Sequence, residues 1–247
     1  SEGEIMCDED TVIESNSYLA QESKMGRRDF NKLAVGAAAI LMLPPVANGL
    51  EVVGHDVMVN TPDGDADCYF VHPAKGKHPG VIIWPDILGL RPAFRLMGER
   101  LAKSGYSVLV VNPYYRSARS PVIEPGASFQ DAETRNMVMP YYSALSAETN
   151  VTDAKAYVSY LDAQNSVDVK RKIGTTGYCM GGPMVMRTAA AIPERIGVGG
   201  SFHGSGLVTN DAESPHLLIK NMQADLLIAV AANDDERAPN DKEVLRK

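Results

Sequence analysis

KIGTTGYCMGGPMVMRTAAA, residues 172–191, is the stretch of sequence that decides the fold. A strand-like run at 172–176 leads into a turn with glycine at 177 and 181, and a helix-like run begins at 182. Glycine is needed on both sides of so tight a turn, because larger side chains would collide with the strand and the helix. We expect Cys179, at the tip of the turn, to stand exposed above the carboxyl edge of a sheet. The alternative is an inert buried cysteine in a chance G-x-C-x-G string.

The same turn would make Cys179 reactive. A helix N-terminus beneath the sulfur favours the thiolate over the thiol. The backbone N–H of Met180 would then point towards an oxyanion. The turn therefore predicts a cysteine nucleophile.

Length and charge limit the class of protein. The 247 residues are compatible with one α/β domain plus a tail. The net charge of −7 argues against nucleic acid or an anionic membrane surface as partner. The three cysteines, at positions 7, 68 and 179, form no disulfide framework or metal-binding cluster with histidine. We expect a small-molecule substrate and no cofactor or metal, while the oligomeric state cannot be predicted.

The N-terminal 48 residues are interpreted as a leader and signal peptide, and residues 49–247 as the folded domain. The sequence RRDFNK at 27–32 resembles the twin-arginine export signature. The apolar run at 33–43 is too short to span a bilayer, and PPVA at 44–47 offers a small residue for cleavage. These features predict export to the periplasm. The alternative is a cytoplasmic protein in which 33–43 is a buried alanine-rich helix.

Strand and helix patterns alternate along the rest of the chain. This alternation predicts a mainly parallel sheet with helices on both faces, an α/β fold. The irregular segment 113–150 is long enough to form a lid or a wall of a substrate pocket. The expected strands cover 52–59, 67–72, 80–84, 106–111, 172–176, 196–202 and 226–232, and the expected helices cover 93–103, 151–161 and 182–191.

Several chemically active residues directly follow expected strands. Right-handed crossovers bring the loops after parallel strands to one edge of the sheet, where ligands bind. We therefore expect convergence at this edge of the following residues: Cys179, Asp86, Arg116, His203 and Asp235.

Three motifs in this chain resemble those of the dienelactone hydrolase family. They are GYCMGG at 177–182, WPDILGL at 84–90, and ANDD at 232–235 with Pro239 shortly after. The resemblance covers the chain from Val52 to its C-terminus. It implies an α/β-hydrolase fold and a carboxylic ester hydrolase that opens small cyclic esters or lactones with a Cys–His–Asp triad.

The resemblance also implies roles for individual residues. Cys179 would be the nucleophile, and the N–H groups of Ile87 and Met180 would form the oxyanion hole. Asp235 would be the triad acid, since its spacing to Pro239 fits the family, with Asp234 as the competing candidate.

Asp86 occupies the place of an acidic residue, more often glutamate, that holds the resting cysteine in the family. The alternative is that Asp86 simply caps the helix that follows.

Three further residues are candidates for binding substrate: Trp84, Arg116 and His203. Arg116 would pair with a substrate carboxylate, or alternatively would be a solvated surface arginine. His203 would otherwise be a structural histidine bonded to loop backbone, which is the interpretation we favour.

No histidine occurs among the twelve residues after Asp235, although the fold places its triad histidine after the acid. We expect that histidine beyond residue 247, in a final helix–strand unit missing from a truncated chain. The competing hypothesis is a catalytically inactive binding protein or fragment. A thiol redox protein is the weakest reading, because the sequence has no C-x-x-C.

Overall fold

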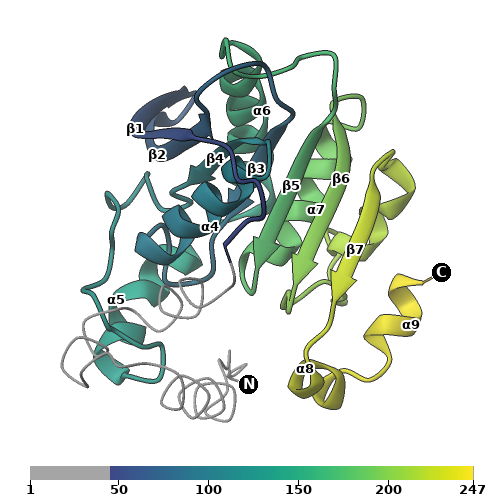
Figure 1. Ribbon diagram of the computed structural model, residues 1–247. Helices are drawn as coiled ribbons and strands as arrows, with labels where there is room; N and C mark the ends of the chain where they lie inside the picture. The colour runs from purple at the N-terminus through teal and green to yellow at the C-terminus, as the bar shows by residue number, and fades with distance from the viewer. Residues whose placement is uncertain (1–44, 247) are drawn as a thin grey trace.

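A mainly parallel sheet organises the part of the chain that the structure, a computed structural model, describes: residues 45–246. Seven strands within this range form one sheet in the order β1-β2-β4-β3-β5-β6-β7 (Figure 1). The β1–β2 and β2–β4 pairs are antiparallel, and every other pair is parallel. The strands are β1 (Val52–Thr61), β2 (Gly64–Pro73), β3 (Gly80–Trp84), β4 (Ser107–Val111), β5 (Ile173–Tyr178), β6 (Ile196–Phe202) and β7 (Asp225–Ala229).

Helices cover both faces of this sheet. One face is packed against α4, which contacts β2 and β4, and the other against α7, which contacts β5 and β6 and packs on α6 (Figure 1). The helices are α4 (Pro92–Lys103), α5 (Ala132–Ser143), α6 (Ala147–Asp162), α7 (Gly181–Ala191), α8 (Ala232–Arg237) and α9 (Asp241–Leu245), with a 3-10 helix η1 (Pro215–Asn221).

The core is divided by the sheet into two layers. Successive side chains of a strand point to opposite faces. Ile82 and Trp84 of β3 accordingly join the cluster under α6 and α7, whereas Val81 and Ile83 join the cluster under α4. All five residues of β3 are buried, which explains its continuous apolar sequence.

The predicted α/β class and most of the predicted elements are confirmed. β3 and β6 have the predicted bounds, and the first two expected strands correspond to β1 and β2, which pair as an antiparallel hairpin. The segment 113–150 was expected to be irregular, but it contains α5 and the start of α6. The last strand ends at Ala229 rather than at residue 232, because helix α8 begins at Ala232.

The predicted signal peptide lies outside the described residues, apart from its last four positions. The twin-arginine signature and the expected export therefore stay predictions, as does the domain boundary at residue 49. Within residues 45–246, the structure contains no helix with the length and apolar character required to span a membrane.

Candidate active site

The turn between β5 and α7 holds Cys179 in a strained conformation. Its φ angle is 51°, in the left-handed region that side chains rarely adopt. Hydrogen bonds fix this geometry from both sides. The N–H of Cys179 donates to Phe202 O at 3.0 Å, and its carbonyl accepts from Gly182 N at 3.0 Å and Ser205 N at 3.3 Å.

The glycines around Cys179 are required by the close approach of backbone atoms. A Cβ atom on Gly177 would lie 2.2 Å from Gly181 O, and one on Gly181 would lie 2.3 Å from Trp84 O. One on Gly182 would lie 2.5 Å from the Cα of Gly204. Only glycine allows the start of α7 to lie this close to the end of β3 and to the loop after β6, so the turn has the backbone geometry of a nucleophile elbow.

The exposure expected for Cys179 is wrong, because the residue is only 3% exposed. Tyr114, which is itself buried, lies against the elbow, since its hydroxyl contacts Met180 Sδ at 3.2 Å and donates to Ile87 O at 2.8 Å. Burial raises the pKa of the Tyr114 hydroxyl, and the nearby Asp86 and Cys179 raise it further. Tyr114 thus lies within electrostatic range of both the sulfur and the acid.

The two candidate oxyanion donors lie on adjoining segments. Ile87 follows β3 and Met180 precedes α7, and both residues are buried. Neither backbone N–H donates a hydrogen bond to an acceptor within residues 45–246. Both donors are therefore available to a ligand.

The carboxylate of Asp86 is occupied by local partners. It forms a bidentate ion pair with Arg91, at 2.6 and 2.7 Å, and accepts the N–H of Leu88 at 3.0 Å. The alternative that Asp86 caps the following helix is wrong, because the N-cap of α4 is Arg91 and no side chain caps it. The expected contact between Asp86 and the resting cysteine stays a prediction.

Asp235 lies at the start of α8, beyond the end of β7. Its Oδ2 pairs with Lys242 Nζ at 2.7 Å, and its Oδ1 is buried without a hydrogen-bond partner among the described residues. One carboxylate oxygen is thus free to accept a hydrogen bond. Asp234 occupies the preceding position of the same helix.

His203 follows β6 at the carboxyl edge, as expected. Its φ angle is 40°, and its N–H donates to Ala229 O at 2.8 Å. Its imidazole forms no hydrogen bond with another described residue, so the loop-bonded structural histidine that we favoured is not what the structure contains.

Trp84 is not placed to contact a substrate. It is 1% exposed and packs on Tyr157, with ring centroids 5.6 Å apart. Its indole belongs to the core beneath α6 and α7.

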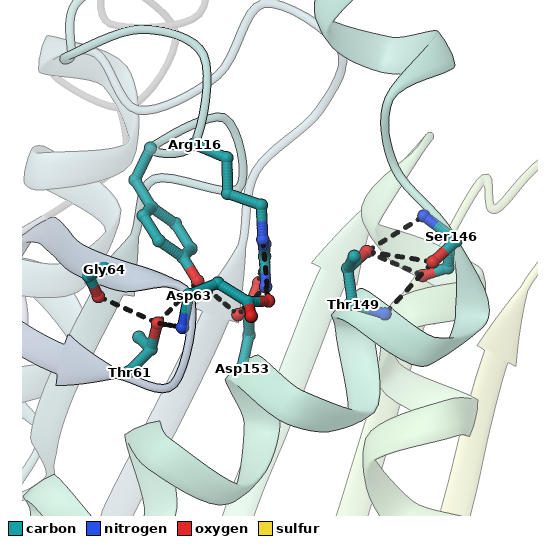
Figure 2. A network of polar contacts seen from close by, with 8 residues as sticks. Thr61, Asp63, Gly64, Arg116, Ser146, Thr149 and Asp153 are labelled. Carbon is teal, nitrogen blue, oxygen red and sulfur yellow. Dashed lines mark hydrogen bonds and ion pairs between the residues drawn. The ribbon is translucent and has the colours of Figure 1, made fainter.

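The guanidinium of Arg116 is paired with acidic side chains of the protein itself. Figure 2 shows its guanidinium between Asp63 in the β1–β2 turn and Asp153 of α6, with N–O distances of 2.6 to 3.0 Å. It also lies over the ring of Tyr115, 4.6 Å from the centroid. Neither expectation for Arg116, a substrate carboxylate or full solvation, fits donors that already bind two acids.

A pocket of about 310 Å³ opens beside the elbow. It is bounded by the α5–α6 segment, the first two turns of α7 and the loop after β6, and its lining includes Met180, Arg187 and Ser205. A larger pocket, about 570 Å³, lies between β7 and α9, and Cys179 and Met180 do not line it. Among residues 45–246, no three His, Cys, Asp or Glu side chains are grouped to bind a metal ion.

Sequence reasoning missed Tyr114 and Arg187. Tyr114 follows β4, so the rule used for the other edge residues would have found it. Arg187 is the one charged residue in the apolar run of α7, which was the available signal.

The sheet order, the covering helices and the elbow define an α/β-hydrolase fold. Solved structures of the same fold include the dienelactone hydrolase from Anabaena variabilis, with a TM-score of 0.58, 15% identity and coverage of 79% of this chain and 81% of that one. A dienelactone hydrolase-like promiscuous phosphotriesterase from metagenomic libraries aligns with a TM-score of 0.61 and 22% identity over 79% of this chain and 77% of that one.

The chain belongs to the dienelactone hydrolase family, whose profile matches residues 66–247. A carboxymethylenebutenolidase from Pseudomonas putida is 29% identical over 135 residues, which cover 55% of this chain and 54% of that protein. The chain thus spans about half the length of the curated relatives it matches.

Proposed function

We propose that the protein containing this chain hydrolyses small carboxylic esters, lactones among them, with Cys179 as the nucleophile. The observation that carries the proposal is the positive φ of Cys179, at 51°, between glycines that admit no Cβ atom. Such strain persists only where the surrounding structure imposes it, and it is concentrated at functional sites. Family membership supports the same chemistry.

In the proposed reaction, the thiolate of Cys179 forms a bond to the ester carbonyl carbon. The carbonyl electron pair moves to oxygen, and the N–H groups of Ile87 and Met180 stabilise the resulting oxyanion. Collapse of this intermediate breaks the ester C–O bond, and an imidazolium protonates the departing oxygen. Water then hydrolyses the thioester, which releases the acid and restores the thiol.

The base is proposed to be a histidine C-terminal to residue 247, held by Asp235. The unpartnered Oδ1 of Asp235 is a suitable acceptor for an imidazole N–H, which would fix the tautomer and stabilise the imidazolium. The other histidines of the chain, apart from His203, are placed by different elements than Cys179 and Asp235. His55 and His72 are on β1 and β2, His78 precedes β3, and His216 bonds to Ser214.

Reaction also requires the buried sulfur of Cys179 to turn towards the pocket beside Met180. We propose that rotation of the Cys179 side chain achieves this, because the adjacent residue Met180 lines that pocket. The buried position is then the resting state, and the rotated thiolate is the attacking state.

Alkylation by iodoacetamide across pH, with each cysteine assayed by peptide mass spectrometry, tests the nucleophile. Cys68 is the matched control, because it is as buried as Cys179, at 1% against 3%, and burial raises its thiol pKa. We expect Cys179 to react below about pH 8 and Cys68 to stay unmodified. Equal inertness of the two cysteines would contradict the proposal.

A second candidate, a non-catalytic binding protein with the same fold, is favoured by the ion pairs of Asp86 with Arg91 and of Asp235 with Lys242. Measurement of thiol-dependent hydrolysis of 4-nitrophenyl acetate by the protein encoded by the whole gene separates the two. A whole-gene product that contains the histidine but lacks this activity supports the binding protein.

A further inference from the structure

Tyr114 is a buried tyrosine that contacts both residues whose backbone N–H groups are the candidate oxyanion donors. Its hydroxyl donates to Ile87 O at 2.8 Å and lies 3.2 Å from Met180 Sδ. The tyrosine belongs to the loop after β4, whereas Ile87 follows β3 and Met180 precedes α7. One phenol therefore connects three segments that are distant in the sequence.

Hydrogen bonds hold the peptide groups on either side of Ile87. In the preceding peptide, Asp86 O accepts from Gly89 N at 2.9 Å. In the following peptide, Leu88 N donates to Asp86 Oδ1 at 3.0 Å, and Ile87 O accepts from Tyr114. The N–H of Ile87 has no acceptor in the part of the chain that the structure describes. The neighbouring bonds thus fix the direction of this N–H without occupying it.

The bond from Tyr114 differs from the other two, because it comes from outside the turn at residues 86–89. Bonds within a turn set its own shape, whereas a bond from another element sets its orientation relative to the rest of the site. Tyr114 is itself firmly held. Its N–H donates to Asn112 Oδ1 at 3.0 Å, and its ring packs on Tyr141 of α5, with centroids 5.7 Å apart.

The hydroxyl of Tyr114 is a lasting donor. Burial raises its pKa, and the charges of Asp86 and Cys179 act in the same direction, so the phenol keeps its proton at neutral pH. Ile87 is 1% exposed, so its carbonyl has little access to water as an alternative partner. Loss of the hydroxyl would leave this carbonyl unsatisfied, and the peptide would turn towards another donor.

We propose that Tyr114 is a positioning residue for the oxyanion hole. Its hydroxyl holds Ile87 O, which keeps the N–H of Ile87 directed, together with that of Met180, at the oxygen of the substrate carbonyl. This inference rests on the proposed function, which supplies the oxyanion. Donors fixed in advance stabilise charge as it develops, so the contribution of Tyr114 belongs to the transition state and not to ester binding.

The kinetic test compares Tyr114→Phe with Tyr115→Phe in the protein encoded by the whole gene. Tyr115 is the matched control, because it is also buried and its hydroxyl makes two hydrogen bonds, with Asp153 at 2.8 Å and Thr61 at 2.7 Å. With 4-nitrophenyl acetate, we expect Tyr114→Phe to lower kcat at least about tenfold while KM stays within about twofold of wild type. Tyr115→Phe should leave both constants within about twofold of wild type, although it loses stability.

A small trifluoromethyl ketone, 1,1,1-trifluorobutan-2-one, measures oxyanion binding directly. The thiolate of Cys179 adds reversibly to the carbonyl carbon, and the carbonyl electron pair moves to oxygen, which gives a thiohemiketal oxyanion. Such an adduct resembles the intermediate of ester hydrolysis. We expect the inhibition constant to rise in Tyr114→Phe by about the factor by which kcat falls, and to stay unchanged in Tyr115→Phe.

Amide hydrogen exchange of the 86–89 turn gives a readout without turnover. We expect faster exchange of the Leu88 and Gly89 N–H groups in Tyr114→Phe and wild-type rates in Tyr115→Phe. A wild type that hydrolyses no ester, with exchange faster only in Tyr114→Phe, would refute the proposed function and support the hold of Tyr114 on the turn. Unchanged kcat in Tyr114→Phe, an equal loss of kcat in both variants, or unchanged exchange would overturn the role of Tyr114.

Discussion

Replacing Gly177 with alanine should destabilise the fold through a clash that no side-chain rotation can relieve. The new Cβ would lie 2.2 Å from Gly181 O and 2.5 Å from Gly181 C, both backbone atoms at the start of α7. Relief requires α7 to move away from β5, although Val185 of that helix is fully buried in the core. Overpacking of this kind typically costs about 3 kcal/mol at the upper end of its usual range.

A control is available three residues earlier in the same strand. A Cβ on Gly174 would lie 3.2 Å from Val198 Cγ2 and 3.6 Å from Val81 Cγ2. Val198 is 55% exposed and can shift by a few tenths of an ångström. Gly174→Ala should therefore change the free energy of unfolding by less than about 1 kcal/mol, since the lost chain entropy of the unfolded state partly compensates.

Urea unfolding followed by tryptophan fluorescence measures both variants. Trp84 is the single tryptophan of the chain and is 1% exposed, so its emission reports loss of the core directly. With a slope of about 2 kcal/mol per molar urea, Gly177→Ala should lower the midpoint by about 1.5 M and Gly174→Ala by less than about 0.5 M. Equal midpoints for the two variants would refute the argument that Gly177 is required because of its close contact with the backbone of α7. The loss of stability would then be a general effect of replacing a glycine in β5.

Three other predictions concern charged groups. Arg116→Met should cost about 3 kcal/mol of stability at neutral pH, because it leaves Asp153, whose side chain is 3% exposed, buried without a cation. Burial raises the pKa of Asp153 even though Arg116 opposes this effect, so falling pH protonates the carboxyl and removes the buried charge. The difference in free energy of unfolding between variant and wild type should therefore shrink as the pH of the denaturation curves falls. A difference that stays constant with pH would contradict the ion-pair explanation. Burial opposes ionisation of Asp67, but hydrogen bonds from Ser120 and Asn112 outweigh it and lower the pKa of this carboxyl. The stability that the ionised carboxylate contributes is therefore present above its unfolded pKa and is lost as pH falls through its folded pKa. Ser120→Ala should move acid unfolding to higher pH, and an unmoved transition would exclude Asp67 as a cause of acid unfolding. Finally, a reporter fused to the N-terminal segment should reach the bacterial periplasm, and lysine at both positions 27–28 should block it; export that persists would contradict the twin-arginine route.

The sequence predicts the elements whose patterns are local. β3 is a run of five apolar residues, and its bounds follow from that run alone. Glycine at positions 177 and 181 indicates the strained backbone at Cys179, because only a crowded turn requires glycine at both positions. Helix α5 was missed since Pro140 lies inside it and normally indicates a helix end.

The surroundings of the site could not be predicted, because they depend on residues far apart in the chain. The sheet-edge rule would have placed Tyr114 at the same edge as the elbow, but not its contact with Met180, which joins residues 66 positions apart. The partners of Arg116 are 53 and 37 residues away, in the hairpin turn and in α6. The Nε of Arg187, which is buried without a hydrogen-bond partner among residues 45–246, likewise becomes visible only when its neighbours have been placed.

The contact of Gly181 with the carbonyls of Trp84 and Pro85 has a consequence for thermal behaviour. It joins the segments that carry the N–H groups of Ile87 and Met180. The distance between these two N–H groups is therefore set by the sheet and not by a mobile loop. Such donors need no reorganisation when negative charge develops between them. Heating should consequently abolish anion stabilisation at this point only when the sheet itself melts, with no earlier, separate inactivation step.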